Sequence, residues 1–385
     1  MARKAPLRDD LSGLAGPSCV GDSSDRVVSL RSLGPGQLRS RGRVVLLGFL
    51  GVACGKGASS SPPDASFGSA VDAHISGRVD VGLGGDADGD SSAGAITVLA
   101  TGQQGAYSIA VDSTSVYWNN YVVNGSVMKV ALDGGDPVTL AATQTMPEFM
   151  TIDAASAYWA SDDAVGKVPL GGGTTATLVS GRQGITGITV AGDYLYWAEA
   201  GLGEGAILKI PVDGGVAVTL ASGQIDRLGI SVFGSNVYFG GSSNIEDVPS
   251  DGGLPVLLTP ADAGGVVQIA VNATHVYWTS SAGTLMTVPI DGGVPVALVL
   301  GRTGTWGAVI DSANIYWTEY RPDGIVASAP LTRIMSNPLF GGATTGGAIV
   351  TLASMQAGPF GIAIDDASVY WTNAIGGQVL KARKR

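Results

Sequence analysis

Residues 108–140 read SIAVDSTSVYWNNYVVNGSVMKVALDGGDPVTL, and the pattern of this stretch returns six more times before the C-terminus. Each copy is marked by a tyrosine that is followed by a second aromatic residue. These tyrosines are Tyr117, Tyr158, Tyr196, Tyr238, Tyr277, Tyr316 and Tyr370, with gaps by subtraction of 41, 38, 42, 39, 39 and 54 residues. Recurrence at this period indicates a tandem array of one supersecondary unit.

Within one copy, four short apolar runs are separated by turn residues, which predicts four antiparallel strands and leaves no length for a helix. The first three strands are expected at 109–111, 116–118 and 128–132. The fourth is expected at 138–140, after the turn Asp133-Gly134-Gly135. Asp-Gly is a strong hairpin signal because glycine adopts positive φ without steric cost.

The aromatic pair decides how the copies are arranged. Adjacent side chains of a strand point to opposite faces, so Tyr117 and Trp118 can both be buried only if neighbouring copies cover both faces of the sheet. Sheets packed radially around an axis provide that cover, which predicts an all-β, seven-bladed β-propeller of four-stranded blades. The last copy has no fourth strand, and the run 95–100 (AITVLA) is expected to supply it and close the ring.

The order I-A-V-D, then Y-W, then D-G-G resembles the YWTD repeats of LDL-receptor class B-like and TolB-like propellers. Residues 362–365 (IAID) and 369–373 (VYWTN) show the match. The resemblance implies a propeller over about residues 95–385, with six blades as the family's usual number, and it implies little about function because such propellers include receptors, lyases, lactonases and scaffolds. The family's final Asp is absent, so its hydrogen-bond network between blades is not carried over. That position holds Asn120, Ser161, Glu199, Gly241, Ser280, Glu319 and Asn373.

Residues 1–54 are interpreted as an N-terminal extension that ends in a secretory signal. Three arginines at 39, 41 and 43 precede an apolar run at 44–53 and then Cys54, which is the pattern of a charged region followed by a short hydrophobic segment. Residues 50–54 (LGVAC) also resemble a bacterial lipoprotein box, although Gly51 stands where that family has Leu. The resemblance implies lipidation of Cys54, with export to the periplasm, outer membrane or cell surface. A plain signal peptide, or a buried segment with an incidental cysteine, is the alternative.

Residues 55–92 are rich in Gly, Ser, Ala and Asp and are expected to form a disordered linker, followed by the propeller at 93–385. Asp86, Asp88 and Asp90 have the spacing of a calcium loop, but Thr97 stands where such a loop needs a bidentate Glu, which favours a solvated linker. The formal net charge of −10 argues against nucleic acid as a partner. The protein is expected to be a monomer.

Strand direction separates two ends of the predicted ring. The short Gly-rich turns lie at one end, and the loops that follow the second and fourth strands lie at the other. Function usually resides on variable loops over a rigid scaffold, so this second end is the predicted ligand face. The candidate binding residues there are Tyr107, Glu148, Arg182, Glu199, Arg227, Trp306, Glu319 and Phe360. Tyr107, Trp306 and Phe360 occupy one equivalent position and can alternatively plug the channel, and Glu199 and Glu319 can alternatively be solvated.

Catalytic motifs are not found in the sequence. It holds no G-x-S-x-G, H-E-x-x-H or Walker motif, and His275 is expected in a turn at the end opposite the loops. We therefore expect no catalytic residues, no cofactor and no metal, and a binding or scaffold module for a protein or glycan rather than an enzyme. The alternative is a metal-dependent lactonase or hydrolase in which Glu148, Asp162, Glu199 and Glu319 converge; a purely structural envelope protein is a third possibility.

Overall fold

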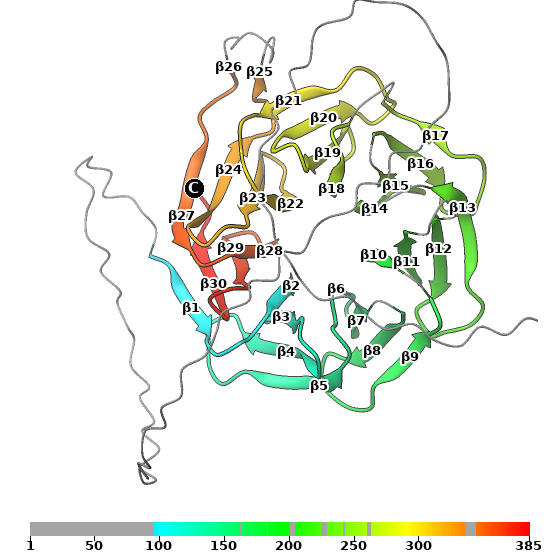
Figure 1. Cartoon of the computed structure of the whole chain (residues 1–385), viewed down its shortest axis with the longest axis vertical. Helices are drawn as coiled ribbons and strands as arrows, with labels where there is room; N and C mark the ends of the chain where they lie inside the picture. Colours follow the sequence, from blue (N-terminus) through cyan, green and yellow to red (C-terminus); the bar gives the residue numbers. More distant parts are fainter. Residues whose placement is uncertain are drawn as a thin grey trace, which may run out of the picture. The chain divides into compact units, whose positions relative to one another are not determined.

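The computed structural model describes residues 95–385 except 162, 183, 201–204, 225–228, 242, 260–262 and 336–343. These residues form strands and no helix, and seven antiparallel sheets of four strands stand in a ring (Figure 1). The seven-bladed prediction is confirmed, and the six-bladed alternative is wrong. No helix in the described part of the chain is long and apolar enough to span a membrane. Cys54 and residues 1–92 lie outside the described residues.

We number the blades along the chain; in blades 1 to 6 the strands lie side by side in chain order, and in blade 7 the first strand of the chain takes the outer place. Blade 1 contains β2 (Ala106–Val111), β3 (Ser115–Asn120), β4 (Gly125–Ala131) and β5 (Val138–Gln144). Blade 2 contains β6 (Phe149–Ile152), β7 (Ser156–Ala160), β8 (Val165–Pro169) and β9 (Ala176–Val179). Blade 3 contains β10 (Ile185–Ala191), β11 (Tyr194–Glu199), β12 (Gly205–Pro211) and β13 (Val218–Gln224).

Blade 4 contains β14 (Gly229–Phe233), β15 (Asn236–Gly240), β16 (Ile245–Pro249) and β17 (Val256–Leu257). Blade 5 contains β18 (Val266–Val271), β19 (His275–Ser280), β20 (Leu285–Pro289) and β21 (Val296–Val299). Blade 6 contains β22 (Thr305–Ile310), β23 (Asn314–Glu319), β24 (Gly324–Pro330) and β27 (Val350–Gln356). Blade 7 contains β28 (Pro359–Ile364), β29 (Ser368–Asn373), β30 (Gln378–Arg383) and β1 (Thr97–Ala100).

The N-terminal strand closes the ring, as the sequence predicted. β1 runs antiparallel to β30, with Thr97 opposite Lys381 and Val98 opposite Leu380. Leu99 and Ala100 are buried in a cluster that also contains Ile109 of blade 1. The first strand and the last three strands of the chain therefore form one blade, and no blade lacks its outer strand.

The aromatic pairs form the contacts between blades. Within each of the seven hydrophobic clusters, the tyrosine of one blade packs with residues of a neighbouring blade, as Tyr117 does with Trp159 and Tyr316 with Trp371. The tryptophans of blades 1, 3, 5, 6 and 7 are fully buried. Burial of each aromatic side chain removes on the order of 150–250 Å² of surface from contact with water. Because the two aromatic side chains of each pair point to opposite faces of the second strand, both faces had to be covered, and the neighbouring blades cover them.

The D-G-G turns adopt the backbone geometry that their composition predicts. In blade 1, Gly134 and Gly135 have φ of 93° and 126°, a region that L side chains avoid. The turn is closed by the N–H of Gly134, which donates to the carbonyl of Ala131. Apart from an insertion in blade 6, this end of the ring has short and similar turns, and we name it the turn end; the opposite end is the loop end.

Blade 6 carries the insertion that lengthens the last interval to 54 residues. Within it, β25 (Ile334–Met335) and β26 (Thr344–Thr345) pair as a small hairpin. Arg333 at its base donates from Nε to the carbonyl of Leu298 in blade 5, at 2.9 Å, and from Nη1 to the carbonyl of Gly347, at 2.5 Å. The insertion is therefore joined to its neighbouring blade.

Candidate functional site

Aromatic rings gather at the loop end, where blades 6, 7 and 1 meet. The ring of Tyr107 stacks on that of Phe360 with a centroid separation of 3.6 Å, and on Tyr121 at 4.9 Å. The ring of Trp306 lies 4.7 Å from Phe360, and Tyr320 meets Phe360 edge-on at 5.6 Å. We name these five residues the aromatic cluster. Three of the predicted site residues, Tyr107, Trp306 and Phe360, are thus brought into one contiguous group.

Exposure varies across the aromatic cluster. Phe360 at its centre is buried, Tyr107, Tyr121 and Trp306 are half-buried, and Tyr320 is 41% exposed. The cluster is therefore buried at its centre and open to solvent at Tyr320.

Threonines that follow the tryptophans hold the strands that carry this cluster. Thr279 Oγ1 donates to the carbonyl of Trp306 at 3.0 Å. Thr318 Oγ1 donates to the carbonyl of Phe360 at 2.6 Å, and Thr372 Oγ1 to that of Tyr107 at 2.5 Å. All three threonines are fully buried. The backbones of Trp306, Phe360 and Tyr107 are therefore each hydrogen-bonded to the preceding blade.

Thr318 and Thr372 also accept a hydrogen bond within their own blades. The N–H of Gly307 donates to Thr318 Oγ1, and the N–H of Gly361 donates to Thr372 Oγ1, both at 3.0 Å. Each hydroxyl thus satisfies one donor and one acceptor in the interior, where an unpaired group costs about 1–3 kcal/mol. In blades 2, 3 and 4 the corresponding residues are Ala160, Ala198 and Gly240, which cannot form this bridge.

Glu199 and Glu319 have a structural role that the sequence analysis did not predict. Each follows a tryptophan by two residues and accepts its indole N–H, at 2.6 Å from Trp197 and 3.2 Å from Trp317. Glu319 is 2% exposed, so the expectation of a solvated carboxylate is wrong for this residue. It is paired with Arg302 at 2.5 Å and with Arg321 at 3.3 Å.

Arg182, a predicted site residue, is the partner of Glu199. Its Nε and Nη2 donate to the two carboxylate oxygens at 2.5 and 2.7 Å. These hydrogen bonds raise the pKa of the Arg182 guanidinium above its ordinary value. A planar two-bond pair of this kind fixes both side chains. Arg182 and Glu199 are therefore committed to each other within blade 3.

A spacing of 17 residues between two bonded side chains recurs in four blades, as an arginine and glutamate pair in two of them and as a glutamine and asparagine pair in the other two. The residue 17 positions before Glu199 or Glu319 is an arginine, and the residue 17 positions before Asn120 or Asn373 is a glutamine. In the glutamine blades, Trp118 and Trp371 donate to Gln103 and Gln356 at 3.2 and 3.1 Å. An acceptor for the buried indole N–H is common to all four. This 17-residue spacing can be read from the sequence, and it points to Arg302, which is not among the predicted site residues.

Three of the predicted carboxylates, Glu148, Glu199 and Glu319, are not part of a metal site within the part of the chain that the structure describes. The described residues contain no group of three or more His, Cys, Asp or Glu side chains placed to hold a metal ion. Glu148 lies before β6, where its N–H donates to the carbonyl of Ala160. Asp162 and Arg227 lie outside the described residues. His275 lies at the turn end, with Nδ1 3.0 Å from Thr274 Oγ1, as expected.

The comparisons with known proteins agree with the fold. No protein-family model matches the chain, and no curated protein matches it. Among solved structures, it is similar to U3-55K with a TM-score of 0.58 at 11% identity, covering 77% of this chain and 100% of that one. It is also similar to the WD40 propeller domain of Doa1, with a TM-score of 0.56 at 11% identity over 75% and 95% of the two chains.

A third similar structure is the computationally designed Ika8 protein, with a TM-score of 0.52 at 14% identity over 74% and 98% of the two chains. At these identities the likeness extends to the fold and not to the site. The chain is therefore a seven-bladed β-propeller, and its loop end must be interpreted from its own residues.

Proposed function

We propose that this propeller is a non-enzymatic binding or scaffold module that contacts a protein or glycan through the loop end. The observation that carries the proposal is the aromatic cluster, in which five rings from three blades meet around Phe360 with Tyr320 41% exposed. Tyr and Trp are enriched at interfaces because each combines a large apolar face with a polar group.

The cluster is also rigid, which favours recognition. Its strands are tied to the preceding blades through Thr279, Thr318 and Thr372, so a partner would meet rings whose backbone is already ordered. Preorganised anchors lose little conformational entropy on binding. Arg321 lies next to Tyr320 and bonds Glu319, which adds a charged rim to the aromatic centre, the usual composition of an interface hot spot.

Photo-crosslinking tests this proposal directly. Tyr320 is replaced by benzoylphenylalanine in the full chain, and Tyr194, which is 37% exposed at the turn end, serves as the matched position. Crosslinks to a discrete partner should form at 320 and not at 194, and Trp306→Ala or Arg227→Ala should reduce them while the melting temperature stays within a few degrees. Equal crosslinking at both positions would refute the proposal. Cation-dependent hydrolysis of lactones or esters, abolished by Glu148→Gln, would replace it with the enzyme alternative.

We further propose that the protein is exported and anchored through lipidated Cys54, with repeats of the YWTD type. The leader supports this with its arginines and the apolar run 44–53 before the cysteine. The repeat type is supported by an aspartate and tyrosine bond in four blades, such as Asp365 Oδ2 with Tyr370 Oη at 2.6 Å. Palmitate labelling and detergent partition of the wild type, lost in Cys54→Ala, are the expected results. Equal labelling of the two would disprove lipidation.

A further inference from the structure

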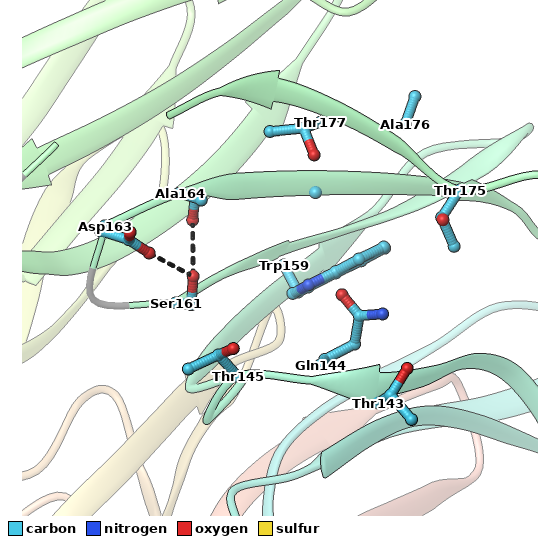
Figure 2. A pocket seen from close by; sticks show the side chains of 11 residues that line it. Thr143, Gln144, Thr145, Trp159, Ser161, Asp163, Ala164, Thr175, Ala176 and Thr177 are labelled. Carbon is cyan, nitrogen blue, oxygen red and sulfur yellow. Dashed lines mark hydrogen bonds between the residues drawn. The ribbon is translucent and has the colours of Figure 1, made fainter. Parts of the chain in front are cut away.

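A cavity at the border of blades 1 and 2 is lined by two hydrogen-bonding groups that have no partner among the described residues. Its volume is about 180 Å³, more than ten times the about 10–15 Å³ that holds one water. The end of β5 and the residues after it form one side, β8 and the start of β9 form the other, and Trp159 lies between them (Figure 2). It is separate from the aromatic cluster, with which it shares no residue.

Trp159 is the first of these groups. In blades 1, 3, 5, 6 and 7 the indole N–H of the equivalent tryptophan donates to an acceptor at 2.6–3.2 Å, and in blade 4 the equivalent residue is Phe239. Trp159 is 4% exposed and has no hydrogen-bond partner among the described residues. Its Nε1 is not among the buried side-chain atoms that lack a partner, so the N–H is open to the cavity, where an acceptor can enter.

Gln144 is the second group, and it stands where an acceptor for Trp159 is expected. It precedes Ser161 by 17 residues, the spacing of Gln103 and Gln356 from their asparagines. Its Nε2 donates to the carbonyl of Ala142 at 2.6 Å, as Gln356 Nε2 does to Ser354 at 2.8 Å. The side-chain amide of Gln144 is therefore oriented by the same kind of bond as that of Gln356, yet its oxygen has no donor among the described residues.

Gly166 explains why the two groups do not meet. It pairs with Trp159 across β7 and β8, and an added Cβ there would lie 2.2 Å from the indole Cζ2. The ring thus occupies the space that a side chain fills in other blades, such as Met128 opposite Trp118. Because the indole leans over Gly166, its N–H is not bonded to Gln144, and a cavity is left at this position.

We propose that this cavity binds a small neutral polyhydroxylated molecule, such as a monosaccharide or inositol. A hydroxyl group accepts from Trp159 Nε1 and donates to the oxygen of Gln144, which matches both missing partners at once. Ser161, Thr145 and Thr177 place further hydroxyl groups around the cavity. Asp163 is the charged residue among the described lining residues, so the cavity does not favour anions.

Titration of the tryptophan indole signals tests this site. The full chain is labelled with ¹⁵N at tryptophan, and D-glucose, D-galactose and myo-inositol are added separately. The Trp159 indole signal, assigned by its loss in Trp159→Phe, should shift and saturate for at least one of them with a Kd in the millimolar range, about −4 kcal/mol. Trp118→Phe is the matched control, because it removes an indole that is already bonded to Gln103, and it should leave the response unchanged.

Gly166→Ala provides a second variant. Its methyl group should displace the indole from the space over residue 166, fill the cavity and abolish the response, although the protein stays folded. If this variant does not fold, the titration of the wild type still tests the proposal, because Trp159→Phe, which places phenylalanine where blade 4 already has it, is needed only to assign the signal. A Trp159 signal that does not move with any of the three compounds, or a saturating shift of Trp306 alone, would overturn the proposal.

Discussion

The two sides of the ring are joined by different bonds although every blade derives from one repeat. On the side from blade 7 to blade 4, a lysine of the third strand reaches forward to a backbone carbonyl of the next blade near its turn end. These donors are Lys381 to Leu132, Lys129 to Leu170, Lys167 to Val212 and Lys209 to Ser250. On the side from blade 5 to blade 1, buried threonines join the blades at the loop end.

The lysine position is Asp247, Thr287 and Ser328 in blades 4, 5 and 6, and there the following blade reaches back instead. The donors are the N–H of Gly293 to Leu258, Arg333 to Leu298 and Lys384 to Asp311. Among the described junctions, the one from blade 7 to blade 1 alone has both a forward bond from a third-strand lysine to a backbone carbonyl and a threonine bond. The ring therefore closes with different hydrogen bonds at different junctions, and each junction has at least one. The side joined by threonines is the side that carries the aromatic cluster.

The largest effect should come from removing the strand that completes blade 7 beside its junction with blade 1. Deletion of residues 93–100 removes β1, which exposes the edge of β30 and the surface that Leu99 and Ala100 cover. Loss of an edge strand and its apolar contacts should lower the melting temperature by more than ten degrees or cause aggregation. Calorimetry and light scattering measure this, and an unchanged melting curve would contradict closure by β1.

A smaller loss is expected from the threonine side. Thr318→Val keeps the shape of the side chain but leaves the N–H of Gly307 and the carbonyl of Phe360 without their bonds in a fully buried position. At about 1–3 kcal/mol for each of the two unsatisfied groups, the free energy of unfolding should fall by about 2–6 kcal/mol. Urea denaturation gives the value. The exposed Thr219→Val is the control and should change it by less than about 0.5 kcal/mol.

The lysine side should be less sensitive. Lys129 donates to the carbonyl of Leu170 at 2.7 Å, but it is half-buried, and water can replace its ammonium in Lys129→Met. We expect a loss of about 1 kcal/mol, within the lower range for a hydrogen bond to a charged group. Arg385→Met, an exposed residue, should be neutral. A loss equal to that of Thr318→Val would remove the distinction between the two sides.

The smallest effect should appear only in acid. Partial burial raises the pKa of Asp311, but hydrogen bonds from Lys384, from the N–H groups of Ala313 and Asn314, and from Tyr316 outweigh it and hold the pKa at about 2. A carboxyl whose pKa is lower when folded stabilises the protein above its unfolded pKa of about 4, and this stability is lost as pH falls from 4 towards 2. The melting temperature of Asp311→Asn should therefore depend less on pH in this range than that of the wild type. Parallel pH profiles for the two proteins would count against this assignment.

The fold could be predicted from the sequence because each blade repeats the residues that specify it. The aromatic pair needs cover on both faces, and the absent last strand pointed to residues 95–100. Strand bounds were less accurate: the third strand of blade 1 was expected at 128–132 and is Gly125–Ala131, because the pairing of Asn120 with Ser126 extends the ladder beyond the apolar residues.

The site could be predicted only in part. Tyr107, Trp306 and Phe360 occupy equivalent positions in their blades, so their contact follows from the repeat. Glu199 and Glu319 look like surface carboxylates in sequence because the arginines that bury them lie 17 residues away in a loop. The cavity at Trp159 could not be predicted, since it depends on where the ring lies over Gly166.

Amide hydrogen exchange at two glycines tests most directly whether the buried threonines fix the strands that carry the aromatic cluster. The N–H of Gly307 bonds Thr318 and that of Gly361 bonds Thr372, both at 3.0 Å, so in the wild type both should exchange only through global unfolding. In Thr318→Val, Gly307 should exchange at least about tenfold faster than Gly361, which corresponds to about 1.4 kcal/mol. Equal exchange of the two amides in that variant would show that the threonine bonds do not hold these strands.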